Sequence, residues 1–157
     1  MISKAISYVE NESSLIKESI LLNLNKVDSL SHRIGITGPP GSGKSTLVNQ
    51  LVKFFREKNK RVAVLLVDPT SPFTNGSVLG DRIRVNRYYN DEDVFIRSVP
   101  SRNSTGGLSY NISEISDVLE SASFDIIIYE TVGVGQVEID IVKEVDSVIL
   151  TLVPEEY

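Results

Sequence analysis

The fold is indicated by one stretch, Gly38-Pro39-Pro40-Gly41-Ser42-Gly43-Lys44-Ser45, which Thr46 follows. This stretch has the spacing G-x-x-x-x-G-K-[ST] of a loop that binds phosphate. A short apolar segment, residues 33–37, precedes the loop, and residues 46–55 follow it with apolar side chains at helical spacing. Strand, loop and helix in this order are the context that distinguishes the phosphate-binding motif from an ordinary Gly-rich turn.

The chemistry of the loop follows from its residue types. Glycine lets the backbone bend closely around a phosphate with its N–H groups pointing inward, and the N-terminus of the following helix adds a positive dipole end. Lys44 can bridge the β- and γ-phosphates of a nucleoside triphosphate, and the Ser45 hydroxyl can bind Mg²⁺. We therefore predict that a nucleotide contacts Gly38, Pro39, Pro40, Gly41, Ser42, Gly43, Lys44, Ser45 and Thr46.

The composition excludes several other kinds of site. The 157-residue chain has no cysteine, which excludes disulfides, thiolate metal sites and cysteine nucleophiles. Its single histidine, His32, stands at the entry to the first strand, where we expect a surface residue rather than a general base. The net charge is −5, and neither a Lys/Arg run nor an apolar run of membrane-spanning length is present. We expect a cytoplasmic protein whose main partner is neither nucleic acid nor a membrane.

Apolar strand patterns alternate with helical patterns along the chain. Strands are predicted at residues 33–37, 61–67, 93–99, 124–129 and 147–153, and helices at residues 46–55, 77–87, 113–122 and 139–145. This alternation predicts an α/β fold of the P-loop NTPase type, with a doubly wound, mostly parallel sheet that binds ligands at the carboxyl ends of its strands. Residues 1–30 carry spaced apolar side chains, which predict one or two amphipathic helices packed on a domain formed by residues 31–157.

Three acidic residues are placed where a metal ion or water could be held. Asp68 ends an apolar strand and Glu130 ends another, so both are expected at the same edge of the sheet as Ser45. From the residues alone, Asp68 could equally start a turn before Pro69. Asp81 lies in a segment rich in Gly, Ser, Thr and Asp that is a candidate switch loop, where it could hold metal or water or be a solvated charge.

The loop after Glu130 resembles a sensor of the γ-phosphate. Gly133 or Gly135 could offer a backbone N–H to that phosphate, and Gln136 could orient a water molecule or cap the following helix. We assign catalytic roles to Lys44, Asp81, Glu130 and Gln136, metal binding to Ser45, Asp68, Asp81 and Glu130, and a further nucleotide contact to Gly133.

Four blocks of sequence together resemble one known family. They are residues 35–47, residues 67–82, residues 94–98 and residues 130–136. Many families share the phosphate loop, but the Asp-Pro-Thr-Ser-Pro-Phe and Glu-Thr-Val-Gly-Val-Gly-Gln segments together are typical of far fewer families. On these residues the chain resembles the MeaB/ArgK group of GTPases, the metallochaperone G proteins associated with methylmalonyl-CoA mutase.

The resemblance implies GTP binding and hydrolysis with Mg²⁺, coupled to guarding or loading an adenosylcobalamin-dependent mutase. It matches Lys44 to the phosphate-binding lysine, Ser45 to the Mg²⁺ ligand, and Asp68, Asp81 and Glu130 to the acidic residues that organise metal and water. The family's guanine-reading motif, Asn-Lys-x-Asp, and its dimerising C-terminal extension are not among these residues. We therefore expect an NTPase domain that is incomplete at its C-terminus, with guanine preference implied by resemblance only.

Two other functions remain open at this stage. One is a P-loop small-molecule kinase that uses ATP, since the same loop spacing occurs in such kinases. The other is a truncated module with weak or no NTPase activity that acts through a partner.

Overall fold

The computed structural model describes residues 2–11, 14–24, 31–68, 88, 90–100, 111–131 and 136–154 of the chain. Its helices are α1 (Ile2–Asn11), α2 (Ser14–Leu22), α3 (Lys44–Glu57), α5 (Asn111–Ser121) and α6 (Gln136–Glu144). Its strands are β1 (His32–Thr37), β2 (Val62–Asp68), β3 (Val94–Pro100), β4 (Ile126–Thr131) and β5 (Ser147–Leu150).

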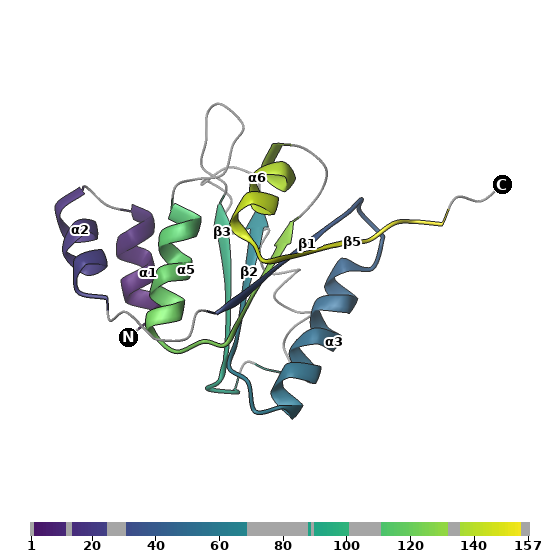
Figure 1. The fold of residues 1–157 in the computed structure, drawn as a ribbon, viewed down its shortest axis with the longest axis horizontal. Coiled ribbons are helices and arrows are strands. Elements are labelled where there is room, and N and C mark those ends of the chain that lie inside the picture. Colours follow the sequence, from purple (N-terminus) through teal and green to yellow (C-terminus); the bar gives the residue numbers. More distant parts are fainter. Residues whose placement is uncertain are drawn as a thin grey trace.

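The five strands form one sheet in the order β3-β2-β4-β1-β5, and each pair of neighbours is parallel (Figure 1). Because the strands run in the same direction, their carboxyl ends lie along one edge, where ligands of such sheets bind. The prediction of an α/β fold of the P-loop NTPase type is confirmed.

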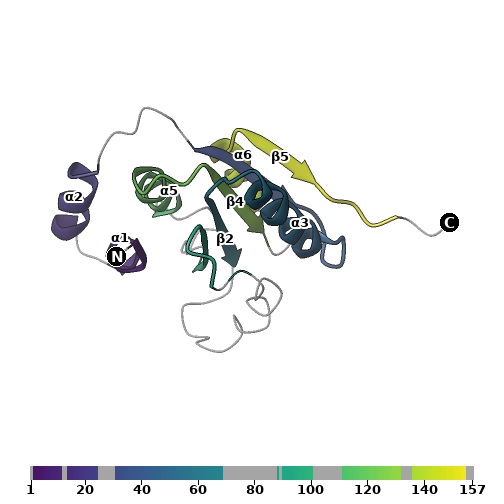
Figure 2. The same cartoon turned by 90° about the horizontal axis from the view of Figure 1, so that it is seen from below.

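Helices cover both faces of the sheet, which explains the continuous apolar run in β2. Residues 62–67 are at most 8% exposed. The odd-numbered side chains from Ala63 to Val67 join a core cluster with α1, α5 and α6, whereas the even-numbered ones from Val62 to Leu66 join a second cluster with α3. Figure 2 shows the sheet between these two groups of helices, with β5 at one edge. A parallel strand that is buried on both faces has no polar side to alternate with its apolar side.

The N-terminal residues form two helices, α1 and α2, where the sequence predicted one or two. Ile6 and Val9 of α1 are buried beside α5, and α2 contacts both α1 and α5. Arg97 of β3 fastens α1 to the sheet, since its guanidinium donates to Glu10 Oε1 at 3.1 Å and to Ser7 Oγ at 3.0 Å. The division of the chain into a helical segment, residues 1–30, and a domain, residues 31–157, stays a prediction.

β1, β2 and β3 lie within one residue of their predicted boundaries, whereas β4 and β5 differ by two or three residues. β5 ends at Leu150 instead of residue 153, because its partner β1 ends at Thr37, directly opposite Leu150. β4 begins at Ile126 instead of residue 124, because the N–H groups of Asp125 and Ile126 both donate to the Arg61 carbonyl at the entry to the strand. β4 continues to Thr131, so Glu130 is a paired residue of the strand, opposite Ile36 of β1 and Leu66 of β2.

The helices predicted at residues 46–55, 113–122 and 139–145 are present, and each begins two or three residues before its predicted start. α3 begins two residues before the predicted start, at Lys44, and α6 begins three residues before it, at Gln136. The helix predicted at residues 77–87 lies outside the described residues. Within the described ranges, none of the helices combines the length and the apolar character that crossing a membrane requires.

Candidate functional site

The phosphate loop connects the end of β1 to the start of α3. The backbone at Gly38, Gly41 and Gly43 has φ values of +141°, +80° and +87°, a range that glycine adopts without strain. At Gly38 the need for glycine is also steric, because a Cβ there would lie 2.2 Å from the carbonyl oxygen of Thr151. Gly43 is the residue before α3 and has no side chain with which to cap it, so the first N–H groups of the helix can donate to an anion.

Lys44 is the first residue of α3 and its side chain turns back over the loop. The residue is only 7% exposed. Its Nζ donates to the carbonyl oxygens of Gly38 at 2.7 Å and of Pro39 at 2.9 Å. The ammonium group is thus held over the loop by the loop's own backbone, and phosphate oxygens of a bound nucleotide can replace these carbonyls as its acceptors.

Ser45 meets Glu130 of β4 at the carboxyl edge of the sheet. The Ser45 hydroxyl donates to Glu130 Oε1 at 2.6 Å, a contact between residues that are 85 positions apart in the chain. This distance is typical of a hydroxyl that donates to an ionised carboxylate. The sequence predicted that these two residues would share an edge, and the structure brings them into direct contact.

The oxygen donors of this pair suit Mg²⁺, which favours oxygen ligands and usually takes one or two carboxylates together with substrate phosphates. In the part of the chain that the structure describes, no group of three or more His, Cys, Asp or Glu side chains forms a cage for a metal. Together with phosphate oxygens of a bound nucleotide, the Ser45 hydroxyl and the Glu130 carboxylate fit such a site.

The other predicted site residues are placed only in part. Asp68 is the last residue of β2 and pairs with Pro100, so its backbone lies at the same edge of the sheet as Glu130. Gln136 is the first residue of α6, and the side chains of Asp68 and Gln136 are not described. Asp81 and Gly133 lie outside the described residues. Thr46, Pro40 and Gly41 are exposed at the loop.

Tyr129 supports the strand that carries Glu130. It is fully buried and its hydroxyl forms a hydrogen bond with Ser116 Oγ of α5. Burial raises the pKa of Tyr129 to about 12. The phenol is therefore neutral at physiological pH and serves packing between β4 and α5.

One contact residue of the loop was not predicted. Thr151, which follows β5, donates from its N–H to the Thr37 carbonyl at 2.8 Å and lies 2.6 Å, between hydroxyl oxygens, from Ser42. The sequence assigns Thr151 to the interior of a strand, and no local signal distinguishes it there. Its contact depends on the pairing of β5 with β1, which places Leu150 opposite Thr37.

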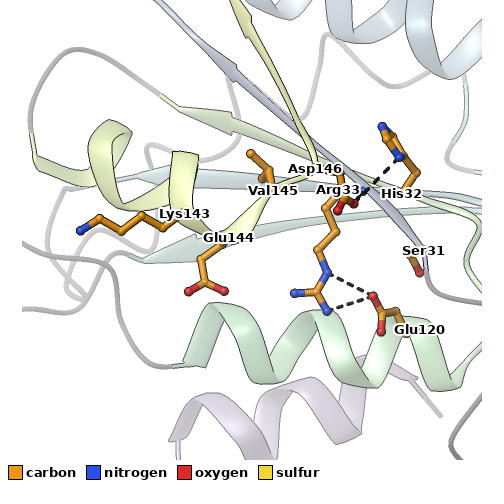
Figure 3. Close-up of a pocket in the computed structure, with 8 residues that line it drawn as sticks. All are labelled: Ser31, His32, Arg33, Glu120, Lys143, Glu144, Val145 and Asp146. Carbon is orange, nitrogen blue, oxygen red and sulfur yellow. Dashed lines mark hydrogen bonds and ion pairs between the residues drawn. The ribbon is translucent and has the colours of Figure 1, made fainter.

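A pocket of about 430 Å³ lies at the amino ends of strands β1 and β5, away from the phosphate loop at their carboxyl ends. It is lined where β1 and β5 begin, by Ser31, His32, Arg33, Glu120, Lys143, Glu144, Val145 and Asp146. Figure 3 shows Arg33 reaching Glu120 and His32 lying beside Asp146. His32 is exposed at the start of its strand, as the sequence predicted.

Comparison with known proteins agrees with this geometry. Residues 2–156 match the family described as methylmalonyl-CoA mutase-associated GTPase MeaB. The chain belongs to this family. The resemblance to MeaB and ArgK, which the sequence carried in four blocks, is confirmed.

Individual MeaB relatives are longer than this chain. A Pyrococcus horikoshii protein, named only as a candidate GTPase, is 48% identical over 153 residues, which are 98% of this chain and 48% of that protein. GTPase ArgK of Escherichia coli K12 is 44% identical over 117 residues, 74% of this chain and 35% of ArgK. A crystal structure described as LAO/AO transport system kinase superposes with a TM-score of 0.72 at 28% identity, over 96% of this chain and 44% of the other. The chain therefore spans about half, or less, of the length of these relatives.

Proposed function

We propose that this chain is the part of a MeaB-type G protein that binds GTP and GDP with Mg²⁺ and hydrolyses GTP. The observation that carries the proposal is the 2.6 Å hydrogen bond from Ser45 to Glu130 at the edge of the sheet, directly beside the phosphate loop. It joins a hydroxyl and a carboxylate where a nucleotide's terminal phosphates and their metal ion would lie. The names of the family and of ArgK supply guanine as the base.

The loop's contribution is to bind and orient the phosphates. The first N–H groups of α3 have no side-chain cap at Gly43 and can donate to phosphate. The Lys44 ammonium group lies over the loop, where it can neutralise charge that develops during phosphoryl transfer. Hydrolysis of GTP needs no nucleophilic side chain, because its catalysis rests on positioning and charge neutralisation. The lack of cysteine and the exposed position of His32 are compatible with this chemistry.

Ser45, Asp68, Asp81 and Glu130 form the proposed metal site. Ser45 would be a direct ligand, and Glu130 would hold the Ser45 hydroxyl in place and accept hydrogen bonds from metal-bound water. Bound Mg²⁺ would supply charge neutralisation at the β- and γ-phosphates. Asp68 and Asp81 are proposed to complete the site, Gly133 to contact the γ-phosphate, and Gln136 to orient the attacking water.

The cellular role is proposed from the family alone. The MeaB description names association with methylmalonyl-CoA mutase, and we propose that the protein acts as a chaperone for an adenosylcobalamin-dependent mutase in the cytoplasm.

Substitution of Lys44 tests the site. Lys44→Ala removes the charge over the loop, and we expect the Kd for a fluorescent GDP analogue with Mg²⁺ to rise about 10- to 100-fold, since hydrogen bonds to charged groups contribute about 1.5–3 kcal/mol each. Lys53→Ala is the matched control, because Lys53 lies on the same helix with its side chain 55% exposed, and its Kd should stay within about twofold. Equal affinities of the two variants would show that Lys44 does not contact phosphate.

A second candidate is phosphoryl transfer to an acceptor other than water. It is favoured by the structural relative described as a transport system kinase, which superposes over 96% of this chain. Release of inorganic phosphate from GTP without any added acceptor supports hydrolysis. Turnover of ATP that requires a small-molecule acceptor supports the kinase.

A further inference from the structure

We infer that Thr151 is a positioning residue: it forms hydrogen bonds at both ends of the phosphate loop and keeps the loop in a conformation that can bind phosphate. This inference rests on the proposed function, since the loop it acts on is the proposed nucleotide site. Thr151 belongs to none of the sequence motifs of the loop, and it reaches the loop from the far end of the chain.

Thr151 contacts both the entry and the exit of the loop. At the entry, its N–H donates to the Thr37 carbonyl at 2.8 Å and its Oγ1 donates to the same oxygen at 3.1 Å. Near the exit, its Oγ1 lies 2.6 Å from Ser42 Oγ. Ser42 Oγ also donates to the Pro39 carbonyl at 2.7 Å. One side chain therefore connects residues on both sides of the glycine-rich turn.

A count of protons shows that two of the three hydrogen bonds available to the two hydroxyls can form at a time, and two of the three possible pairs include the bond between Ser42 and Thr151. Ser42 and Thr151 have one hydroxyl proton each, and three acceptor positions are within reach: the two carbonyls and the partner hydroxyl. If Ser42 donates to Pro39, Thr151 can donate to Ser42 while its N–H keeps the bond to Thr37. If Thr151 donates to Thr37, Ser42 can donate to Thr151. In both of these arrangements a hydroxyl–hydroxyl bond links Ser42 to Thr151. When both protons go to the carbonyls instead, that bond is absent and the Thr151 bonds to Thr37 alone link this segment to the loop.

Close packing of the Thr151 backbone against Gly38 also restricts the position of the loop. The carbonyl of Thr151 lies so close to Gly38 that a Cβ at Gly38 would be 2.2 Å from it. The neighbours of Thr151 face the solvent, since Leu150 is 62% and Leu152 is 69% exposed. The threonine alone among these three turns toward the loop, so its hydroxyl, rather than general burial of the segment, makes the link.

The test compares Thr151→Val, which removes only the hydroxyl, with Thr151→Ser, which keeps it. Ser147→Ala is the control on the same strand, because its hydroxyl bonds His32 at the far end of β5, at 2.9 Å. Two quantities are measured in the full chain: hydrogen exchange of the Ser42 amide without nucleotide, and the Kd for a fluorescent GDP analogue with Mg²⁺.

We expect Thr151→Val to accelerate exchange of the Ser42 amide and to raise the Kd for GDP, each by about 2- to 12-fold, the range given by one net hydrogen bond. A loop that is no longer held must be ordered at the expense of binding energy. Thr151→Ser and Ser147→Ala should stay within about twofold of the unmodified protein in both measurements. Ser42→Ala removes the partner hydroxyl, and combining it with Thr151→Val should add little further loss, because the two side chains form one link.

The outcomes separate this inference from the proposed function. Failure of the unmodified chain to bind GDP contradicts the proposed function, and the exchange measurement then decides the role of Thr151 by itself. Equal exchange and equal affinity in the Val and Ser variants overturn the inference. Faster exchange with unchanged GDP affinity overturns it as well, since the link would then not serve phosphate binding.

Discussion

Replacing Glu130 by glutamine separates its role at a metal site from a role in the fold. The substitution keeps the shape of the side chain and leaves an amide oxygen that can still accept the Ser45 hydroxyl, which now lies 2.6 Å from the carboxylate. It removes the negative charge that would hold metal-bound water and orient the proposed Mg²⁺ ligand. We therefore expect a large effect on magnesium dependence and a small effect on stability.

The magnitude of both effects follows from general values for the Ser45–Glu130 hydrogen bond and for a group that orients a metal ligand. A hydrogen bond to an ionised group contributes about 1.5–3 kcal/mol and a neutral one about 0.5–1.5 kcal/mol, so the free energy of unfolding should fall by about 1 kcal/mol. Loss of the group that orients a metal ligand typically costs about 10- to 100-fold in metal affinity. That factor corresponds to about 1.4–2.7 kcal/mol.

The assay is a titration with Mg²⁺ at a fixed concentration of protein and fluorescent GDP. The Mg²⁺ midpoint of Glu130→Gln should rise about 10- to 100-fold, while nucleotide affinity without metal stays within about twofold. Glu57→Gln is the control, because Glu57 lies at the far end of α3 with its side chain 65% exposed. An unchanged Mg²⁺ midpoint in a folded Glu130→Gln variant would refute the assignment of this carboxylate to the metal site.

Three further predictions concern stability, each measured by urea unfolding. Gly38→Ala should lower the free energy of unfolding by about 2–3 kcal/mol, because its Cβ would lie 2.2 Å from Thr151 O; a loss under 0.5 kcal/mol would mean that the loop shifts freely. Ser116→Ala should lower the free energy of unfolding by about 1–3 kcal/mol and Tyr129→Phe by only about 0.5–1.5 kcal/mol. Ser116 donates to the Ile112 carbonyl, and its removal leaves the buried Tyr129 hydroxyl without its acceptor. A larger loss for Tyr129→Phe than for Ser116→Ala would contradict this explanation. Burial raises the pKa of Tyr129 from 10.0 to about 12. The stabilisation by the neutral phenol is therefore fully present below pH 10 and should be lost as the pH rises toward 12. If the free energy of unfolding falls equally with pH in the unmodified protein and in Tyr129→Phe over that range, Tyr129 is not the cause.

The fold and part of the site could be predicted because they depend on local patterns. The apolar run that forms β2 and the glycine spacing of the loop are readable over fewer than ten residues each. The meeting of Ser45 and Glu130 also followed from topology, since the carboxyl ends of parallel strands share an edge. That inference needed no knowledge of strand order.

The remaining contacts depend on registers that no short pattern encodes. Thr151 reaches the loop only because β5 pairs with β1 so that Leu150 lies opposite Thr37. The same pairing ends β5 three residues before the predicted boundary. Arg97 likewise fastens α1 to β3 across 87 positions of the chain, and an arginine in a strand does not reveal its partner.

The central claim is that this phosphate loop serves guanine nucleotide with magnesium, and a paired titration tests it most directly. The full chain is titrated with fluorescent GDP and ADP analogues, each with and without Mg²⁺. We predict that GDP binds at least about tenfold more tightly than ADP, a difference of about 1.4 kcal/mol, and that Mg²⁺ strengthens GDP binding. Equal affinity for the two nucleotides, or tighter binding of ADP, would contradict the account.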